Sequence, residues 1–200
     1  MKLRSLFLLS LVPALALLLA AARPEDKQAV DPNGAYKVDV VHSSILFKCK
    51  HADTSWAFGR FDDFGGTLTF DSAKPENSKI EITIQAKSVN TNSKDRDQHL
   101  QSPDFFDVKQ FPTATFKSKS VAKKGDKMFA VTGDLMFHGV TKSVSIDMEH
   151  TGSNEHPMMG KIIGFYGTLT LKRSDYGISY GQDVLGDEVT LMLSIESAVK

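Results

Sequence analysis

The sequence predicts an all-β protein, an antiparallel meander of eight or nine strands closed into a barrel, with one or two short helices around residues 92–108. Two observations predict this fold. Apolar and polar residues alternate along most of the chain after Tyr36, as in strands with one buried face. Turn signals, such as Lys124–Asp126 and His138–Val140, separate the alternating segments. A barrel is favoured for so many short strands because closure leaves no open edge.

Each alternating segment presents one apolar face. In SILFKCKH (44–51), Ile45 and Phe47 share one face and Lys48 lies on the opposite one. The later segments of this kind are, in chain order, KIEITIQA (79–86), TATFKSKS (113–120), MFAVTGDLMF (128–137), SVSIDME (143–149), GFYGTLTLK (164–172) and DEVTLMLSIE (187–196). The stretch around residues 92–108 lacks this alternation, and its apolar spacing favours short helices. There the pair Ser102–Pro103 is typical of a helix start.

The N-terminal residues predict export. Lys2 and Arg4 precede an apolar run, Leu6–Leu19, and Ala20–Ala22 supply the small residues that signal peptidase requires. We therefore expect a periplasmic or secreted protein. The expected division of the chain is a cleavable signal peptide over 1–22, a flexible N-terminal lead over 23–35 and one folded domain over 36–200.

Composition narrows the function further. The 24 basic and 24 acidic residues cancel, so the surface offers no electrostatic footprint for nucleic acid. The single cysteine, Cys49, predicts a fold without an internal disulfide. After the signal segment, no stretch approaches the roughly 20 apolar residues of a membrane span. We therefore expect no nucleic-acid partner and no stable membrane span after cleavage.

A charged cluster, DRDQHL, lies in the stretch without alternation. On a helix Asp95 and His99 share one face, which suits two metal ligands or an acid/base pair. Two ligands are too few for a structural zinc site, however. Arg96 can instead form bidentate hydrogen bonds with Asp95, Asp97 or Asp104 and hold the crossing segment on the barrel rim. Alternatively, Arg96 and His99 contact the polar head of a ligand.

Nucleophilic catalysis has little support in the sequence. The chain contains no GxSxG motif. Cys49 lies on the apolar face of its segment, as is typical of a small buried hydrophobe. His51 shares that face, so a hydrolase that uses Cys49 and His51 stays an alternative function.

The aromatic residues point to an apolar ligand. The chain has 13 phenylalanines, and an eight-stranded barrel is about wide enough to hold one small ligand. An interior lined by aromatic and aliphatic side chains suits a long apolar molecule. Strand parity selects as wall residues Phe47, Phe116, Phe129, Phe137, Phe165 and Leu191. The non-alternating stretch contributes Phe105 and Phe106 as rim residues.

Five stretches of the chain, taken in order, resemble the YceI-like family of exported lipid-binding proteins. They are YKVDVVHSSILFKCKH, FGRFDDFGGTLTFD, SVNTNSKDRDQHLQSPDFFDVKQFPTATFKS, VTGDLMFHGVTKSVSI and LKRSDYGI, within residues 36–198. The resemblance implies a lipocalin-like antiparallel barrel whose elongated apolar cavity holds a polyisoprenoid or an isoprenoid quinone. It also implies that the protein has no catalytic residues. From the residues themselves we expect no cofactor and no metal.

The resemblance assigns motif positions residue by residue. They are His42 and Ser43; Arg96, Asp97, His99 and Leu100; Asp104–Asp107; Gly139–Thr141; and Arg173, Ser174, Asp175 and Gly177. His42, Arg96, His99 and Arg173 are the candidates for the rim or for contact with a ligand head group. Two alternatives stay open: a small hydrolase or metal-dependent enzyme using Cys49/His51 or Asp95/His99, and a stress-related barrel that acts through a protein partner. The sequence is compatible with a homodimer.

Overall fold

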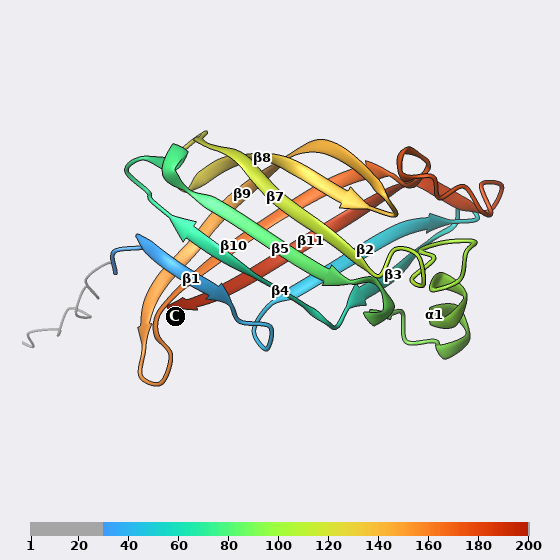
Figure 1. Ribbon diagram of the computed structural model, residues 1–200, viewed down its shortest axis with the longest axis horizontal. Helices are drawn as coiled ribbons and strands as arrows, with labels where there is room; N and C mark the ends of the chain where they lie inside the picture. The colour runs from blue at the N-terminus through green and yellow to red at the C-terminus, as the bar shows by residue number, and fades with distance from the viewer. Residues whose placement is uncertain (1–29, 200) are drawn as a thin grey trace, which may run out of the picture.

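The computed structural model describes residues 30–199, which form an elongated antiparallel barrel with one α-helix beside one end (Figure 1). The strands are β1 (Gly34–Val38), β2 (Ser44–His51), β3 (Ser55–Phe61), β4 (Phe64–Phe70), β5 (Lys79–Gln85), β6 (Val89–Asn90), β7 (Thr113–Lys123), β8 (Met128–Phe137), β9 (Val140–His156), β10 (Gly160–Lys172) and β11 (Leu185–Val199). The helices are α1 (Lys94–Leu100) and the 3₁₀ turns η1 (Pro75–Asn77), η2 (Ala86–Ser88) and η3 (Arg173–Tyr176). The predicted signal peptide lies outside the described residues.

Eight strands close the barrel, in the order β1-β4-β5-β7-β8-β9-β10-β11, with β1 pairing back onto β11. The remaining strands, β2, β3 and β6, extend three of these positions. At the first position, β1 and β2 both pair with β11. At the second, β4 pairs with β1 and β3 pairs with β2. At the third, β5 pairs with β4 and β6 pairs with β3. The fold is therefore an eight-stranded meander in which three strands are interrupted. The predicted all-β antiparallel barrel is confirmed.

The three interruptions lie next to one another and shape one end of the barrel. Asp62 and Asp63 separate β3 from β4, and both form hydrogen bonds with residues at the interruption between β5 and β6. The Asp62 N–H donates to Ser88 O at 3.1 Å, and the Gln85 N–H donates to Asp63 O at 2.9 Å. On the α1 side of these interruptions, the β2–β3 hairpin continues the sheet through the pairing of β2 with β11. β6 pairs with β3 only at Arg60 and Phe61. Over the rest of its length β3 pairs with β2 on one side, and its other side has no strand partner among the described residues.

Alternation places the apolar side chains inside, as the sequence predicts. A core cluster at the end of the barrel remote from α1 includes Tyr36 and Ile163, which are almost fully buried. A second cluster near the middle includes Ile45 and Phe61. The turn between β8 and β9 requires positive φ at His138 and Gly139, as expected for a two-residue hairpin loop.

The stretch that lacks alternation contains one α-helix. After α1, residues 101–112 form turns, and Ser102 O accepts hydrogen bonds from the Phe105 and Asp107 N–H groups. A second helix from Ser102 does not form, because those turns satisfy the backbone groups locally. Among residues 30–199, the helices are all too short or too polar to cross a bilayer.

Candidate functional site

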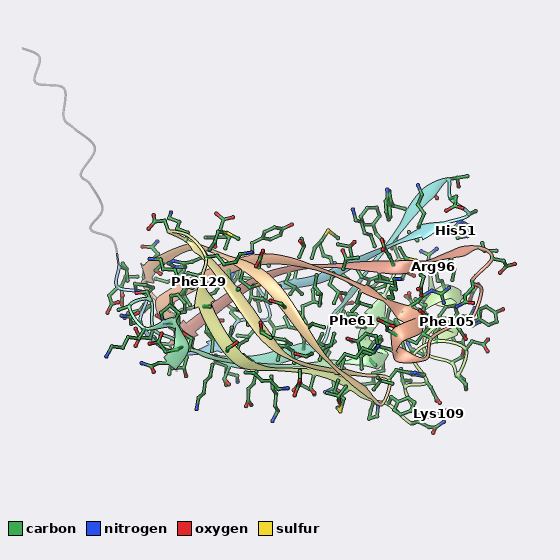
Figure 2. The ribbon with its side chains drawn as sticks, turned by 90° about the horizontal axis from the view of Figure 1, so that it is seen from above. His51, Phe61, Arg96, Phe105, Lys109 and Phe129 are labelled. Atoms are coloured by element: carbon green, nitrogen blue, oxygen red, sulfur yellow. The ribbon has the colours of Figure 1, made fainter. Side chains whose placement is uncertain are left out.

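The interior of the barrel is hollow, and the space has two parts. The outer cavity, of about 1030 Å³, lies at the α1 end, and the inner cavity, of about 100 Å³, lies deeper in the barrel. Both are lined by Ile84, Leu135 and Leu191, which form the throat between them. Figure 2 shows the ends of this space: His51, Arg96 and Phe105 lie at one end of the molecule and Phe129 toward the other.

The outer cavity has aromatic walls that several elements contribute. Ring centroids are 5.6 Å apart for Phe47 and Phe61, 5.9 Å for Phe61 and Phe106, and 5.5 Å for Phe106 and Phe137. Gly59, directly across from Phe47 in the β2–β3 pair, leaves the space that the Phe47 ring fills, and a Cβ there would collide with it. Aromatic contacts at this separation add to the stability of a wall beyond its buried area.

The inner cavity is lined entirely by apolar side chains. Its lining residues include Phe116, Val131, Ile146 and Leu193, and Phe70 lies 5.1 Å from each of Phe129 and Phe165. On β11 the lining runs from Leu185 at the mouth to Ile195 at the inner end. At a strand rise of about 3.3 Å and a tilt of about 40°, this corresponds to roughly 25 Å along the barrel axis.

The structure places all eight predicted wall and rim residues on these two cavities. Phe47, Phe105, Phe106 and Phe137 line the outer cavity; Phe116, Phe129 and Phe165 line the inner one; Leu191 lines both. Ligand contact by these residues stays a prediction.

Comparison with known proteins places this architecture in a family. A model of the YceI-like domain matches residues 36–197. The chain belongs to the YceI-like family. A UPF0312 protein from Pseudomonas aeruginosa is 44% identical over 163 residues, covering 80% of this chain and 85% of that protein.

Solved structures share the fold of this YceI-like protein. BcnA from Burkholderia cenocepacia superimposes with a TM-score of 0.73 at 26% identity, covering 80% of this chain and 98% of BcnA. A polyisoprenoid binding domain from Saccharophagus degradans, implicated in plant cell wall breakdown, has a TM-score of 0.64 at 17% identity, with coverage of 82% and 98%. The second likeness is one of fold alone.

In this YceI-like barrel, the charged cluster of α1 orders the rim of the outer cavity. The Arg96 guanidinium donates from Nε to Thr91 Oγ1 at 2.7 Å and from Nη2 to Thr91 O at 2.6 Å. Asp97 Oδ1 accepts from the Thr91 N–H at 2.7 Å and from its hydroxyl at 2.5 Å. The sequence suggested a carboxylate partner for Arg96, but the structure gives it Thr91. The reason is that Thr91 lies just before α1, where its hydroxyl and carbonyl face the guanidinium.

His99 is not held by Asp95. Its Nε2 lies 2.9 Å from Oδ2 of Asp104, and its ring packs edge-on against Phe105 at 5.0 Å and Tyr180 at 5.2 Å. Phe105 is buried in this trio, and all three rings line the outer cavity. The trio joins the segment after α1 to the loop 177–184 across the mouth.

Arg173 supports the other side of the mouth. Its side chain is buried, with the residue 5% exposed, and it donates hydrogen bonds to four backbone carbonyls, those of Ile178, Tyr180, Leu185 and Gly186. These bonds fold the loop between η3 and β11 against the cavity. Arg173 therefore positions a wall of the cavity through backbone contacts.

Cys49 is half-buried and lines the outer cavity. Burial raises the pKa of the Cys49 thiol, and its Sγ–H donates to Gly186 O at 3.2 Å. His51 lies at the end of β2 and also lines the outer cavity. A thiol with a raised pKa forms less of the thiolate that nucleophilic catalysis needs. The geometry thus gives the hydrolase alternative no support at Cys49.

His42 lies away from both cavities, on the outside of the barrel between β1 and β2. Its Nδ1 is 2.7 Å from Asp39 Oδ2 and 3.7 Å from Glu196 Oε1. The hydrogen bond to Asp39 raises the pKa of His42. His42 therefore ties the β1–β2 loop to β11, and it does not contribute to the rim as the sequence suggested.

Sequence reasoning missed the residues that the loop 177–184 and the edge of β3 bring to the mouth. Ile178, Tyr180 and Val184 line the outer cavity, as do Trp56 and Phe58. The loop has no strand periodicity, so only its three large apolar residues among glycines and polar residues could have indicated a role.

Proposed function

We propose that this chain is an exported, non-catalytic binding protein that holds an amphiphilic isoprenoid lipid, such as a polyisoprenoid or an isoprenoid quinone. The observation that carries the proposal is the pair of adjoining cavities in the barrel, the outer one wide and partly polar at its mouth and the inner one lined entirely by apolar side chains. This shape fits a molecule with a polar head and a long apolar tail.

The physical basis of binding is removal of the tail from water. Each buried CH₂ group contributes about 0.8 kcal/mol, so a chain of about twenty carbons contributes about 16 kcal/mol. This offsets the several kcal/mol lost on association and leaves the roughly 8 kcal/mol that micromolar affinity requires. At the mouth, Arg96 and His99 line the cavity with the polar groups that a hydroxyl, carbonyl or phosphate head group requires.

Three further observations support an isoprenoid ligand. The S. degradans domain of the same fold is described as polyisoprenoid binding. The family motifs of this chain frame the cavity mouth, as Arg96 and Arg173 illustrate. The apolar run Leu6–Leu19 after Lys2 and Arg4 supports export to a compartment where such lipids lie in a nearby membrane.

Mass spectrometry of an organic extract from the protein, purified from its native host without detergent, tests the proposal. We expect one isoprenoid amphiphile enriched over the total lipid extract of the same cells. A matched extract of the apoprotein refolded from denaturant provides the blank. An extract that resembles the total lipid, together with failure of refolded protein to bind geranylgeraniol, would refute the proposal.

Export is tested separately. Amino-terminal sequencing of the native protein should give Arg23 or a neighbouring residue as the first residue. A periplasmic or secreted form that begins at Met1 would contradict the signal peptide.

A further inference from the structure

The β2–β3 hairpin carries exposed aromatic rings next to the cavity mouth. Trp56 is 48% exposed and Phe58 is 57% exposed. Both rings lie on the outer face of the hairpin, because Trp56 pairs with Lys50 and Phe58 with Lys48, opposite in parity to the inward Phe47. Both residues also line the outer cavity, so the opening reaches the surface beside them.

Two lysines share this face with the rings. Lys48 Nζ lies 4.5 Å and Lys50 Nζ 5.0 Å from the centre of the Trp56 ring. Within residues 30–199, no carboxylate is close enough to form a salt bridge with either ammonium group. Asp53 is at the tip of the hairpin and Asp183 is in the loop across the mouth, so the basic character belongs to the flank of the hairpin.

Strand β3 of this hairpin also has one largely unpaired edge. β6 covers β3 only at Arg60 and Phe61, and the lining of the cavity continues from this edge to Arg96 and Leu100 of α1. The outer cavity therefore opens to the surface beside Trp56 and Phe58. Figure 2 shows the hairpin end, marked by His51, projecting from the same end of the barrel as Arg96 and Phe105.

We propose that this flank, defined by Lys48, Lys50, Trp56 and Phe58, docks on the surface of an anionic lipid bilayer. Half-exposed Trp and Phe rings favour the boundary between head groups and acyl chains, and lysines beside them are attracted by anionic head groups. Docking would place the cavity mouth on the bilayer, so a tail passes from membrane to barrel without crossing water. This role in ligand transfer rests on the proposed function, whereas the docking itself does not.

Trp56 is the only tryptophan of the chain, so its fluorescence reports on this flank alone. The test uses flotation with vesicles of phosphatidylcholine, with and without phosphatidylglycerol, and records Trp56 emission in the same samples. The wild-type protein should float with the anionic vesicles, with Trp56 emission shifted to shorter wavelength, and should release at high salt. Absence of flotation with the anionic vesicles would overturn the proposal.

Paired lysine substitutions locate the contact. Lys48→Gln with Lys50→Gln should weaken partitioning about 25-fold, since each lysine near an anionic surface accounts for about fivefold. Lys37→Gln with Lys79→Gln is the matched control: these exposed lysines lie on β1 and β5, and no salt bridge is seen for either in the described part of the chain. Equal loss in both double variants would reduce the effect to net charge and overturn the proposal.

Uptake of geranylgeraniol from vesicle-free solution separates docking from ligand binding. The Lys48/Lys50 variant should take it up like the wild-type protein, because neither lysine lines a cavity. Flotation without uptake would refute the proposed function and leave docking in place, and uptake without flotation would do the reverse. Self-association that shifts Trp56 emission without vesicles would show that a second copy occupies the flank, and would also overturn docking.

Discussion

Narrowing the throat between the two cavities should make the barrel select against long chains. Leu191 lines both cavities, so Leu191→Phe projects a ring into the throat. The outer cavity stays open and the inner one is cut off. Because Leu191 borders empty space and is only partly buried, the substitution should cost roughly 1 kcal/mol of stability or less, below the usual range for overpacking.

The magnitude follows from the volume that is lost. Leaving a cavity empty costs about 24 cal/mol per Å³, so filling the inner cavity of about 100 Å³ contributes about 2.4 kcal/mol to the binding of a tail that reaches it. That corresponds to about 50-fold in affinity. From Leu185 to Leu191 the outer cavity spans roughly 15 Å of the axis, by the same strand rise and tilt. Short prenols therefore fit without the inner cavity.

The assay is a displacement titration with geraniol, farnesol, geranylgeraniol and solanesol. Leu191→Phe should lower affinity for the longest prenols by up to about 50-fold and leave geraniol unchanged. Met192→Phe is the control, since Met192 is the next residue of β11 and pairs with Leu46 on the outer face. An unchanged ratio of long-chain to short-chain affinity in Leu191→Phe would show that the ligand does not enter the inner cavity.

Four other perturbations separate the roles of the site residues. Phe106→Ala removes a ring between Phe61 and Phe137 and should weaken prenol binding by roughly 1–3 kcal/mol in the same titration; wild-type affinity would remove Phe106 from the site. Arg173→Met leaves four backbone carbonyls without their donor and should lower the free energy of unfolding, measured in urea, by about 2–4 kcal/mol. Weaker prenol binding with an unchanged free energy of unfolding would show instead that Arg173 contacts the ligand. The hydrogen bond between His42 and Asp39 raises the pKa of His42 and lowers that of Asp39. The pair therefore stabilises the fold fully between the ordinary pKa values of 3.8 and 6.5. This stabilisation is lost as pH rises through the raised pKa of His42 or falls through the lowered pKa of Asp39. His42→Gln should accordingly lower the melting temperature more at pH about 5.5 than at pH about 8, and an equal shift at both would contradict the linkage. Alkylation of Cys49 by N-ethylmaleimide should be slow because burial raises the thiol pKa, and slower still with bound prenol; a rate that ligand does not change would place the ligand elsewhere.

The sequence predicted the inward face of each strand because side-chain direction has a strict period of two. Phe129, Phe137 and Leu191 could be assigned to the interior from parity alone, and the structure places each of them on a cavity. The three strand interruptions were not predicted. They depend on hydrogen bonds between neighbouring breaks, such as the one from Asp62 to Ser88, and such long-range contacts have no local signal.

The rim was harder to predict because charged residues there bond to backbone. Arg96 bonds to the side chain and carbonyl of Thr91, and Arg173 bonds to carbonyls up to 13 residues away. A sequence displays the carboxylates that a charged side chain might meet, but it does not display which carbonyls will face it. This is why carboxylate pairing was expected for Arg96 and head-group contact for Arg173.

Two sets of residues have different roles at the site: one builds the mouth of the outer cavity, and the other lines the two cavities. The polar motif residues Arg96, Asp97 and Arg173 fix the frame of the mouth through hydrogen bonds to Thr91 and to the carbonyls of the loop 177–184. Most side chains that face the cavities are aromatic or aliphatic, and many of these, such as Phe47, Phe129 and Leu191, lie outside the motif positions. Apolar contacts depend on shape and volume more than on residue identity. The choice of ligand tail should therefore respond to substitutions such as Leu191→Phe that change cavity volume, whereas substitutions of Asp97 and Arg173 should act on ligand binding through the stability of the fold.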